Sequence, residues 1–144
     1  MLSEYLSKFE THFEFSQDEL AHFIVPREKV VEAFVIEEEG EIVDFFSFYA
    51  LPSSILKHVE EKTLFVAYAY YTVAKKHSLE EVMKQALIMA KKKGYDVYNA
   101  LDIMDNRTFF DEHKFGVGDG NLHYYFYNWR VRDVEPEHVS MVLV

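Results

Sequence analysis

The stretch from Leu64 to Leu101, LFVAYAYYTVAKKHSLEEVMKQALIMAKKKGYDVYNAL, contains the patterns of a strand, a helix and a second strand in succession. Residues 64–73 form a nearly continuous apolar run, which is typical of a strand covered on both faces. Ser78 begins a capping box, apolar residues then recur at helical spacing, and Gly94 stands where a helix commonly ends. Residues 96–101 return to a strand pattern. The stretch therefore predicts a βαβ unit with a parallel crossover.

Two short helices and a hairpin are expected before this unit. Residues 3–9 favour one short helix, and Ser16 opens a capping box for a second helix that Pro26 ends. Residues 30–37 and 41–50 are rich in β-branched and aromatic residues, so they are expected to pair as a hairpin. The acidic residues at the turn between them predict a solvated hairpin tip, where like charges discourage edge-to-edge pairing.

A glycine-rich and aromatic segment, Lys114–Trp129 (KFGVGDGNLHYYFYNW), follows a short helix expected from Asp105 or Asn106 to His113. Three glycines in five residues predict a backbone that takes positive φ or is closely approached. The run from Leu122 onward alternates like a strand. The segment is no phosphate loop, because it leads into a strand and carries an aspartate. Two readings stay open, a turn that holds a peptide with a positive end and a bulged hairpin without a ligand.

The chain ends on an apolar stretch, residues 139–144 (VSMVLV), which is expected to form a strand. Such a strand would carry the α-carboxylate into the protein. A buried carboxylate has its pKa raised above the ~3.3–3.7 of a free terminus and becomes a better base. Two simpler readings are that the strand completes the sheet or that the sequence was cut at this point.

Composition narrows the class of protein. The 144 residues suit one domain, and the formal charge of −10 makes nucleic acid an unlikely partner. The one basic cluster, Lys91–Lys93, is expected to serve a helix C-terminus. There is no cysteine and no His-x-His or His-Glu-x-x-His pair, so a metal site has little support. No apolar run approaches the ~20 residues of a membrane span, and we expect a soluble cytoplasmic protein.

Three stretches carry a resemblance to a known family. They are Lys114–Trp129, Phe46–Ser53 (FSFYALPS) and Gly94–Asp102 (GYDVYNALD). With a likeness that runs from about Tyr5 to Val144, they resemble the C-terminal half of eukaryotic N-myristoyltransferase. The resemblance implies an α+β fold, a mixed β-sheet flanked by helices of the GCN5-related acetyltransferase kind. It also implies that residues 1–144 form a single domain, the C-terminal peptide-binding lobe of such an enzyme.

The activity that the resemblance implies is transfer of myristoyl from myristoyl-CoA to the N-terminal glycine of proteins. By resemblance, the terminal carboxylate of Val144 is the catalytic base that deprotonates the glycine amine. The residues that match the family's peptide groove are Ser53, Tyr68, Asp119, Gly120 and Leu122. The implied partners are peptides with an N-terminal glycine and the family's N-terminal acyl-CoA-binding lobe. No cofactor is expected on this chain, because myristoyl-CoA is the co-substrate of the full enzyme.

Two functions stay open from the sequence. In the first, the chain is part of an N-acyltransferase and is inactive alone, because the oxyanion donors belong to the N-terminal lobe. In the second, it is a non-catalytic peptide-binding module or an inactive fragment. A single-lobe acetyltransferase is disfavoured, since no glycine-rich loop opens a helix that would hold the CoA pyrophosphate.

Overall fold

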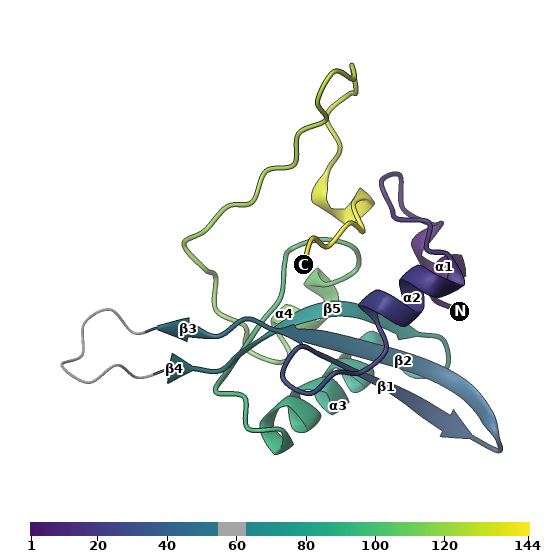
Figure 1. Ribbon diagram of the computed structural model, residues 1–144, viewed down its shortest axis with the longest axis vertical. Helices are drawn as coiled ribbons and strands as arrows, with labels where there is room; N and C mark the ends of the chain where they lie inside the picture. The colour runs from purple at the N-terminus through teal and green to yellow at the C-terminus, as the bar shows by residue number, and fades with distance from the viewer. Residues whose placement is uncertain (55–62) are drawn as a thin grey trace.

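The computed structural model describes residues 1–54 and 63–144 and is built on a four-stranded sheet in the order β1-β2-β5-β6 (Figure 1). The strands are β1 (Val31–Glu38), β2 (Glu41–Ala50), β5 (Val66–Ala74) and β6 (Val97–Asn99). β1, β2 and β5 pair antiparallel, whereas β6 pairs parallel to β5. The predicted hairpin, βαβ unit and mixed α+β sheet are confirmed.

The crossover helix α3 (Leu79–Lys92) begins and ends where the sequence predicts. The Ser78 side chain accepts from the Glu81 amide, and the Glu81 carboxylate accepts in return from the Ser78 amide. At the other end Gly94 takes φ +83°, and two backbone hydrogen bonds turn the chain back toward the sheet. These are the two bonds of a Schellman ending. Both helix boundaries therefore follow from local sequence.

Shorter elements complete the chain. The helices are α1 (Leu2–Leu6), α2 (Gln17–Phe23), α4 (Arg107–Phe110) and the 3-10 turn η1 (Pro136–His138), and the strands β3 (Ser53–Ser54) and β4 (Thr63–Leu64) form a second small sheet. The capping box at Ser16 is confirmed. α4 is shorter than predicted and lacks a side-chain cap, because Asn106 donates to the Leu101 carbonyl and Asp105 accepts from Tyr5. Within the described residues, none of the helices is long and apolar enough to span a bilayer.

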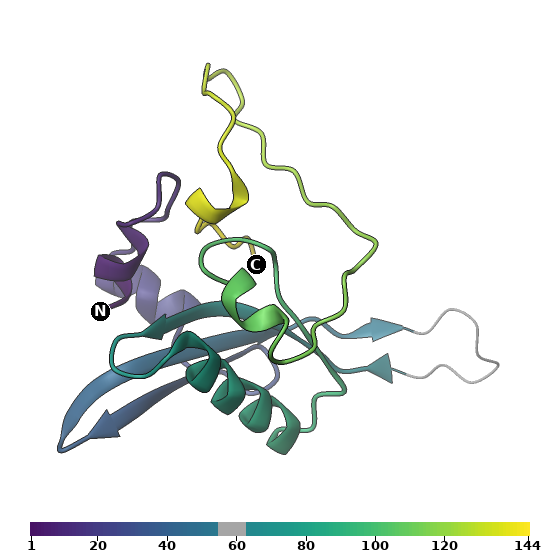
Figure 2. The ribbon, with the colours of Figure 1, turned by 180° about the vertical axis from the view of Figure 1, so that it is seen from behind.

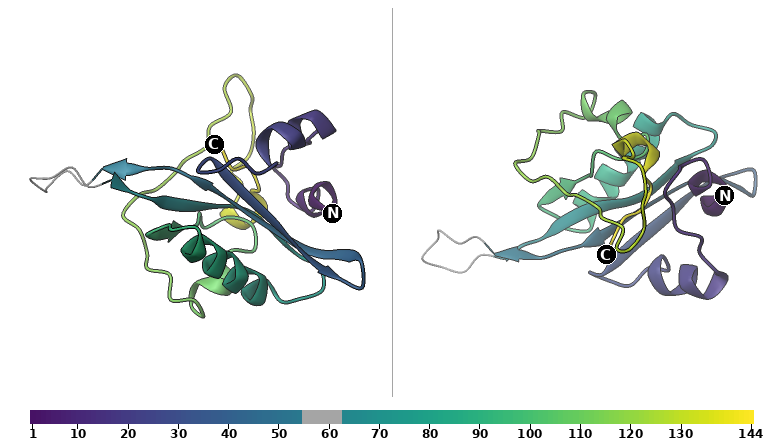
Figure 3. Two further views of the ribbon diagram at one scale, coloured as in Figure 1. Left: turned by 60° about the horizontal axis from the view of Figure 1, so that its bottom comes forward. Right: turned by 90° about the horizontal axis from the view of Figure 1, so that it is seen from above.

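The two faces of the sheet are covered differently (Figure 3). α3 and α4 cover one face and pack on small residues of β5 such as Ala67, together with Phe46 and Phe48 of β2. The other face carries α1, α2, residues 101–104 and the last residues of the chain. Figure 2 shows the same arrangement from behind. The sheet thus separates a helix-covered core from a core that includes the chain end.

A β-bulge in β5 determines which of its side chains pack in the core that contains the chain end. Phe46 pairs with Thr72 and Phe48 with Ala69, so two residues of β5 lie opposite the single residue Ser47. These two residues are Tyr70 and Tyr71, and both belong to the core that contains the chain end. The buried Ser47 hydroxyl donates to the Tyr71 carbonyl (3.2 Å) and accepts from its amide (3.1 Å). The hydroxyl therefore satisfies the backbone groups that a bulge leaves out of the ladder.

Two predicted strands are not formed. Residues 121–126 have no regular structure, and a turn at 127–128 follows, with Asn128 in the left-handed region at φ 60°. At the chain end only Val139 makes a bridge, a parallel one to Thr11. A strand needs a neighbour to receive its hydrogen bonds, and neither segment pairs with a described strand of the sheet, whose edges are β1 and β6. Both segments have the alternating sequence pattern of a strand, but neither has a partner strand among the described residues.

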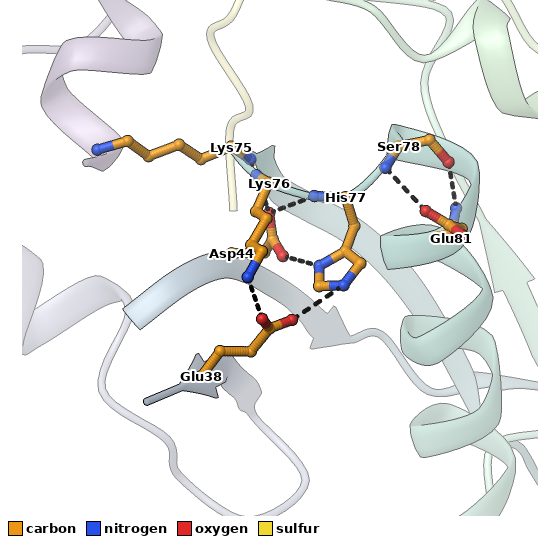
Figure 4. A network of polar contacts seen from close by, with 7 residues as sticks. All are labelled: Glu38, Asp44, Lys75, Lys76, His77, Ser78 and Glu81. Carbon is orange, nitrogen blue, oxygen red and sulfur yellow. Dashed lines mark hydrogen bonds and ion pairs between the residues drawn. The ribbon is translucent and has the colours of Figure 1, made fainter. Parts of the chain in front are cut away.

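A buried carboxylate joins β2 to the turn that leads into α3 (Figure 4). Asp44 is fully buried and accepts from the amides of Lys75 (2.7 Å) and Lys76 (2.9 Å). The His77 Nδ1 lies 2.5 Å from the same carboxylate, and its Nε2 lies 3.2 Å from Glu38. Lys76 also pairs with Glu38. The prediction of a merely solvated hairpin tip is therefore wrong for Glu38, which joins the tip to this turn.

The charges of this network predict how stability depends on pH. Burial tends to raise the pKa of Asp44, but hydrogen bonds from His77 and the backbone outweigh it and leave that pKa lowered. The hydrogen bond to Asp44 raises the pKa of His77, and the charges of Asp44, Glu38 and Glu81 add to the rise. The contribution of His77 to the free energy of unfolding is therefore fully present below the pKa of ~6.5 that the side chain has in the unfolded chain. It is lost as the pH rises through the raised pKa of the folded state.

We expect the melting temperature of the wild type to fall above about pH 6.5 more steeply than that of His77→Gln. The glutamine amide still donates to Asp44 but does not titrate in this range. Thermal unfolding followed by circular dichroism from pH 5.5 to 9 measures the difference between the two curves. Parallel curves would contradict the assigned role of His77. The Asp44 contribution should be lost only on acidification below about pH 4 in both proteins.

Candidate functional site

The last residues of the chain, 138–144, form a tail that is held against the second face of the sheet. The Thr11 amide donates to the His138 carbonyl (3.2 Å), and the Ser140 amide donates to the Thr11 carbonyl (2.8 Å). The Met104 amide donates to the Val139 carbonyl (3.1 Å). Val142 is buried in the core of this face. Both sides of the tail are thus tied to distant parts of the chain.

A group of tyrosine side chains lies beside this tail. We call this group the tyrosine face, and its members are Tyr49, Tyr68, Tyr70, Tyr71 and Tyr124. The rings of Tyr49 and Tyr68 stack at 5.4 Å between centroids, and those of Tyr70 and Tyr71 at 4.5 Å. Burial raises the pKa of Tyr49, and the neighbouring phenols of Tyr68 and Tyr124 add to the rise. The Tyr49 phenol is therefore a neutral hydrogen-bonding group at physiological pH.

Tyr124 contacts the tail directly. Its hydroxyl donates to the Met141 carbonyl at 2.9 Å. Burial raises the pKa of this phenol, and a hydrogen bond from the Leu143 backbone lowers it in part. Tyr124 therefore connects the other tyrosines of the tyrosine face to the end of the chain.

The chain end itself is exposed. Val144 is 61% exposed and Leu143 is 59% exposed, immediately after the buried Val142. The prediction that a strand buries the terminal carboxylate is therefore wrong. The physical reason is that backbone pairing with Thr11 stops at Ser140, so the last two residues extend beyond the contacts that hold the tail.

The glycine segment is exposed except at Phe115 and Tyr124, and it arches away from the sheet between α4 and the tail (Figures 1 and 2). Asp119, Gly120 and Leu122 all lie on this arch, and Leu122 is 60% exposed. None of its three glycines takes positive φ, and a Cβ added to any of them meets no atom within 4 Å. The predicted left-handed or crowded backbone is not found. Nothing within the described residues requires glycine at these positions.

The predicted site residues occupy three places. Tyr68 lies on the tyrosine face near Tyr124, and Val144 ends the tail that Tyr124 contacts. Asp119, Gly120 and Leu122 belong to the segment that carries Tyr124 along the chain. Ser53 lies on β3, where its hydroxyl approaches the Leu51 carbonyl at 3.5 Å. The structure thus connects the glycine segment to the tail through Tyr124, stacks Tyr68 on Tyr49, and leaves Ser53 apart from these contacts.

An open groove of about 540 Å³ lies elsewhere, between β1 and α3. Its lining includes Phe34, Phe46, His77 and Met89, and it contains none of the predicted site residues. The floor of this groove is the outer part of the helix-covered core. The packing of that core is therefore enough to explain why these apolar residues line the groove. Among residues 1–54 and 63–144, no group of three His, Asp or Glu side chains is placed to hold a metal ion. His58 falls outside these residues.

Sequence reasoning missed Tyr49, Ser47 and Tyr124. Tyr124 stood in a run of aromatic residues, and the alternating pattern offered no reason to separate it from its neighbours. Ser47 gave no signal, because a bulge depends on two strands and not on one. Tyr49 stood in a quoted motif, Phe46–Ser53, and only its pairing with β5 brings it against Tyr68.

The mixed sheet, crossover helix and bulged central strand define the fold of the GCN5-related acetyltransferases. A ribosomal-protein-alanine N-acetyltransferase from Brucella melitensis biovar Abortus 2308 superposes with a TM-score of 0.63 at 18% identity, over 88% of this chain and 86% of that one. At this identity the likeness concerns the fold alone. The chain is thus about as long as one complete copy of the fold.

The whole length of the chain also matches one acyltransferase family. Residues 1–142 match the model of the myristoyl-CoA:protein N-myristoyltransferase, C-terminal domain, and the chain belongs to this family. It is 44% identical to glycylpeptide N-tetradecanoyltransferase 2 of Danio rerio over 99% of this chain and 29% of that relative. Saccharomyces cerevisiae N-myristoyltransferase with bound myristoyl-CoA superposes with a TM-score of 0.67 at 34% identity, over 81% of this chain and 32% of that one. The chain spans about three-tenths of the length of such relatives.

Exposed apolar side chains gather in the segment from 117 to 131. They are Val117, Leu122, Tyr125, Phe126, Tyr127, Trp129 and Val131. A monomeric protein seldom exposes so much contiguous apolar surface unless it is an interaction site. Trp129, the single tryptophan of the sequence, is 77% exposed and reports on this segment alone.

We therefore expect the tryptophan emission of the isolated chain to resemble that of free tryptophan in water. Acrylamide should quench it almost as strongly in the native chain as in the chain unfolded in guanidinium. The folded state of the rest of the chain is checked by far-ultraviolet circular dichroism. Blue-shifted emission that resists quenching would show that the segment is packed, contrary to the structure.

Proposed function

We propose that this chain is the peptide-binding lobe of a glycylpeptide N-tetradecanoyltransferase, which moves myristoyl from myristoyl-CoA to the N-terminal glycine of proteins. Membership of the family supports the reaction, and the relatives carry this name. The observation that carries the assignment of this lobe is the tail held beside the tyrosine face. In support of it, the Tyr124 hydroxyl bonds Met141, three residues before Val144.

The reaction needs a base at the attacking nitrogen. The glycine ammonium must lose a proton before its nitrogen attacks the thioester carbonyl, after which the C–S bond breaks and coenzyme A leaves as the thiol. The terminal carboxylate of Val144 takes that proton in our proposal. Its exposure supports this role, since a general base must reach the amine at hydrogen-bond distance. The contacts of Val142 and Ser140 hold the backbone from which it extends.

The peptide lies along the glycine segment in this proposal. Asp119 supplies a negative charge for the cationic amine end, and the exposed amides of Gly120 and its neighbours hold the extended peptide backbone. No atom of residues 1–54 or 63–144 comes close enough to account for the three glycines, and close approach by a peptide backbone would. Tyr68 offers a phenol and an aromatic wall, and Ser53 offers a hydroxyl on β3.

The acyl-CoA and the oxyanion donors come from a second lobe in this proposal. The relatives are about three times as long as this chain, and the solved yeast relative has myristoyl-CoA bound. The exposed apolar side chains from Val117 to Val131 are a surface suited to such a lobe. One domain, residues 1–144, would then contribute the peptide groove and the base, while the other lobe contributes the acyl donor.

We expect the chain alone to transfer no myristoyl group and the chain joined to the N-terminal lobe of a relative to do so. In the joined protein, removal of Val144 should lower kcat about 100-fold, since general bases contribute at least about this factor. Val144→Ala is the matched control, because it keeps the carboxylate at the same backbone position. Transfer is measured with radiolabelled myristoyl-CoA and an N-terminal glycine peptide, and acyl-CoA binding by titration.

Three results would count against the proposal. Turnover by the chain alone would remove the need for a second lobe. An unchanged kcat after removal of Val144 would remove the terminal carboxylate as the base. Peptide binding without transfer in the joined protein would instead favour a non-catalytic peptide-binding module.

A further inference from the structure

We propose that Tyr124 is a positioning residue that joins the glycine segment to the C-terminal tail and so sets where the carboxylate of Val144 stands. The inference rests on the proposed function, because it concerns the base and the peptide segment of that reaction. It assigns Tyr124 no contact with the reacting atoms. Its role is to hold two parts of the site in register.

Tyr124 is the point at which an otherwise exposed segment returns to the body of the protein. Of residues 116–133, it alone is not exposed. Its neighbours Tyr125 and Tyr127 are 88% and 87% exposed. The Tyr124 ring reaches the tyrosine face, where its phenol lies near those of Tyr49 and Tyr71. Between its glycines and the Arg132–Glu10 ion pair, the segment is therefore attached through Tyr124, two residues after Leu122 and five after Asp119.

The hydroxyl of Tyr124 bonds the tail beyond the point where its backbone pairing with Thr11 ends. Within the described residues, the remaining bonds from the tail to distant parts of the chain involve His138, Val139 and Ser140. Tyr124 donates at 2.9 Å to Met141, three residues before the terminal carboxylate. It thus holds the tail one residue beyond the backbone pairing of Ser140 with Thr11. Val142 adds an apolar anchor one residue later.

One side chain consequently connects the two halves of the proposed chemistry. A peptide on residues 119–122 moves with the segment that Tyr124 anchors, whereas the base moves with the tail. The Tyr124 hydroxyl couples these two movements. Small losses of alignment between a base and its proton lower the rate without weakening the binding of the substrate. Loss of the hydroxyl should therefore lower kcat and leave the peptide KM nearly unchanged.

The first test uses the 144-residue chain and needs no activity. Amide hydrogen exchange at Ser140 is measured in Tyr124→Phe and in the matched control Tyr125→Phe, which removes an exposed hydroxyl from the next residue. Loss of one hydrogen bond predicts that the Ser140 amide exchanges about fivefold faster in Tyr124→Phe than in the wild type. In the control its exchange rate should not change. Amides of β2 and β5 in the same samples serve as the reference for global unfolding. Equal exchange in both variants overturns the inference.

The second test measures the reaction in the chain joined to an N-terminal lobe. Tyr124→Phe should lower kcat about fivefold with peptide KM unchanged. A raised peptide KM with unchanged kcat would mean that Tyr124 contacts the peptide, which overturns the positioning role.

Removal of Val144 separates this inference from the function on which it rests. If removal lowers kcat while Tyr124→Phe does not, the positioning role fails and the base remains. If neither change lowers kcat, the base role fails and the inference fails with it. If both changes lower kcat and Tyr124→Phe also speeds exchange of the tail, the positioning role is supported.

Discussion

The bulge in β5 opposite Ser47 is the constraint on which the second face of the sheet depends. A regular strand would place Tyr70 and Tyr71 on opposite faces, and one of them would meet α3. The extra residue turns both rings toward the tail, where they stack at 4.5 Å. The Ser47 hydroxyl makes this possible because it bonds the two backbone groups of Tyr71 that the ladder leaves unpaired.

The same bulge leaves the opposite face with small residues. Ala67 before it and Ala74 after it belong to the core under α3, where the helix packs on β5 with Val82 and Met83. The two faces of the sheet therefore differ in what covers them. One has small side chains under a helix, and the other has large rings with polar tips under an irregular tail. The first face is closed by a regular hydrophobic core. The second keeps phenol groups beside a chain end that remains in contact with water.

Local sequence predicted the elements whose signals lie within a few residues. The capping boxes at Ser16 and Ser78, the glycine after α3 and the hairpin turn each satisfy their own backbone groups nearby. The aromatic run after Leu122 and the end after Val139 carried an equally clear alternation and did not become strands. Their hydrogen bonds would have to be received by another strand, and alternation in one segment says nothing about whether a partner exists.

The sequence by itself determined the fold class, the βαβ unit and the family, because helix caps, apolar periodicity and long motifs are written in contiguous residues. Only the tertiary structure decided that the tail is held by Thr11, Met104 and Tyr124, and that its last two residues stay exposed. Those contacts join residues 17 to more than 100 positions apart along the chain. Their formation depends on strand register and on the bulge, which are properties of paired strands and cannot be read from either strand alone.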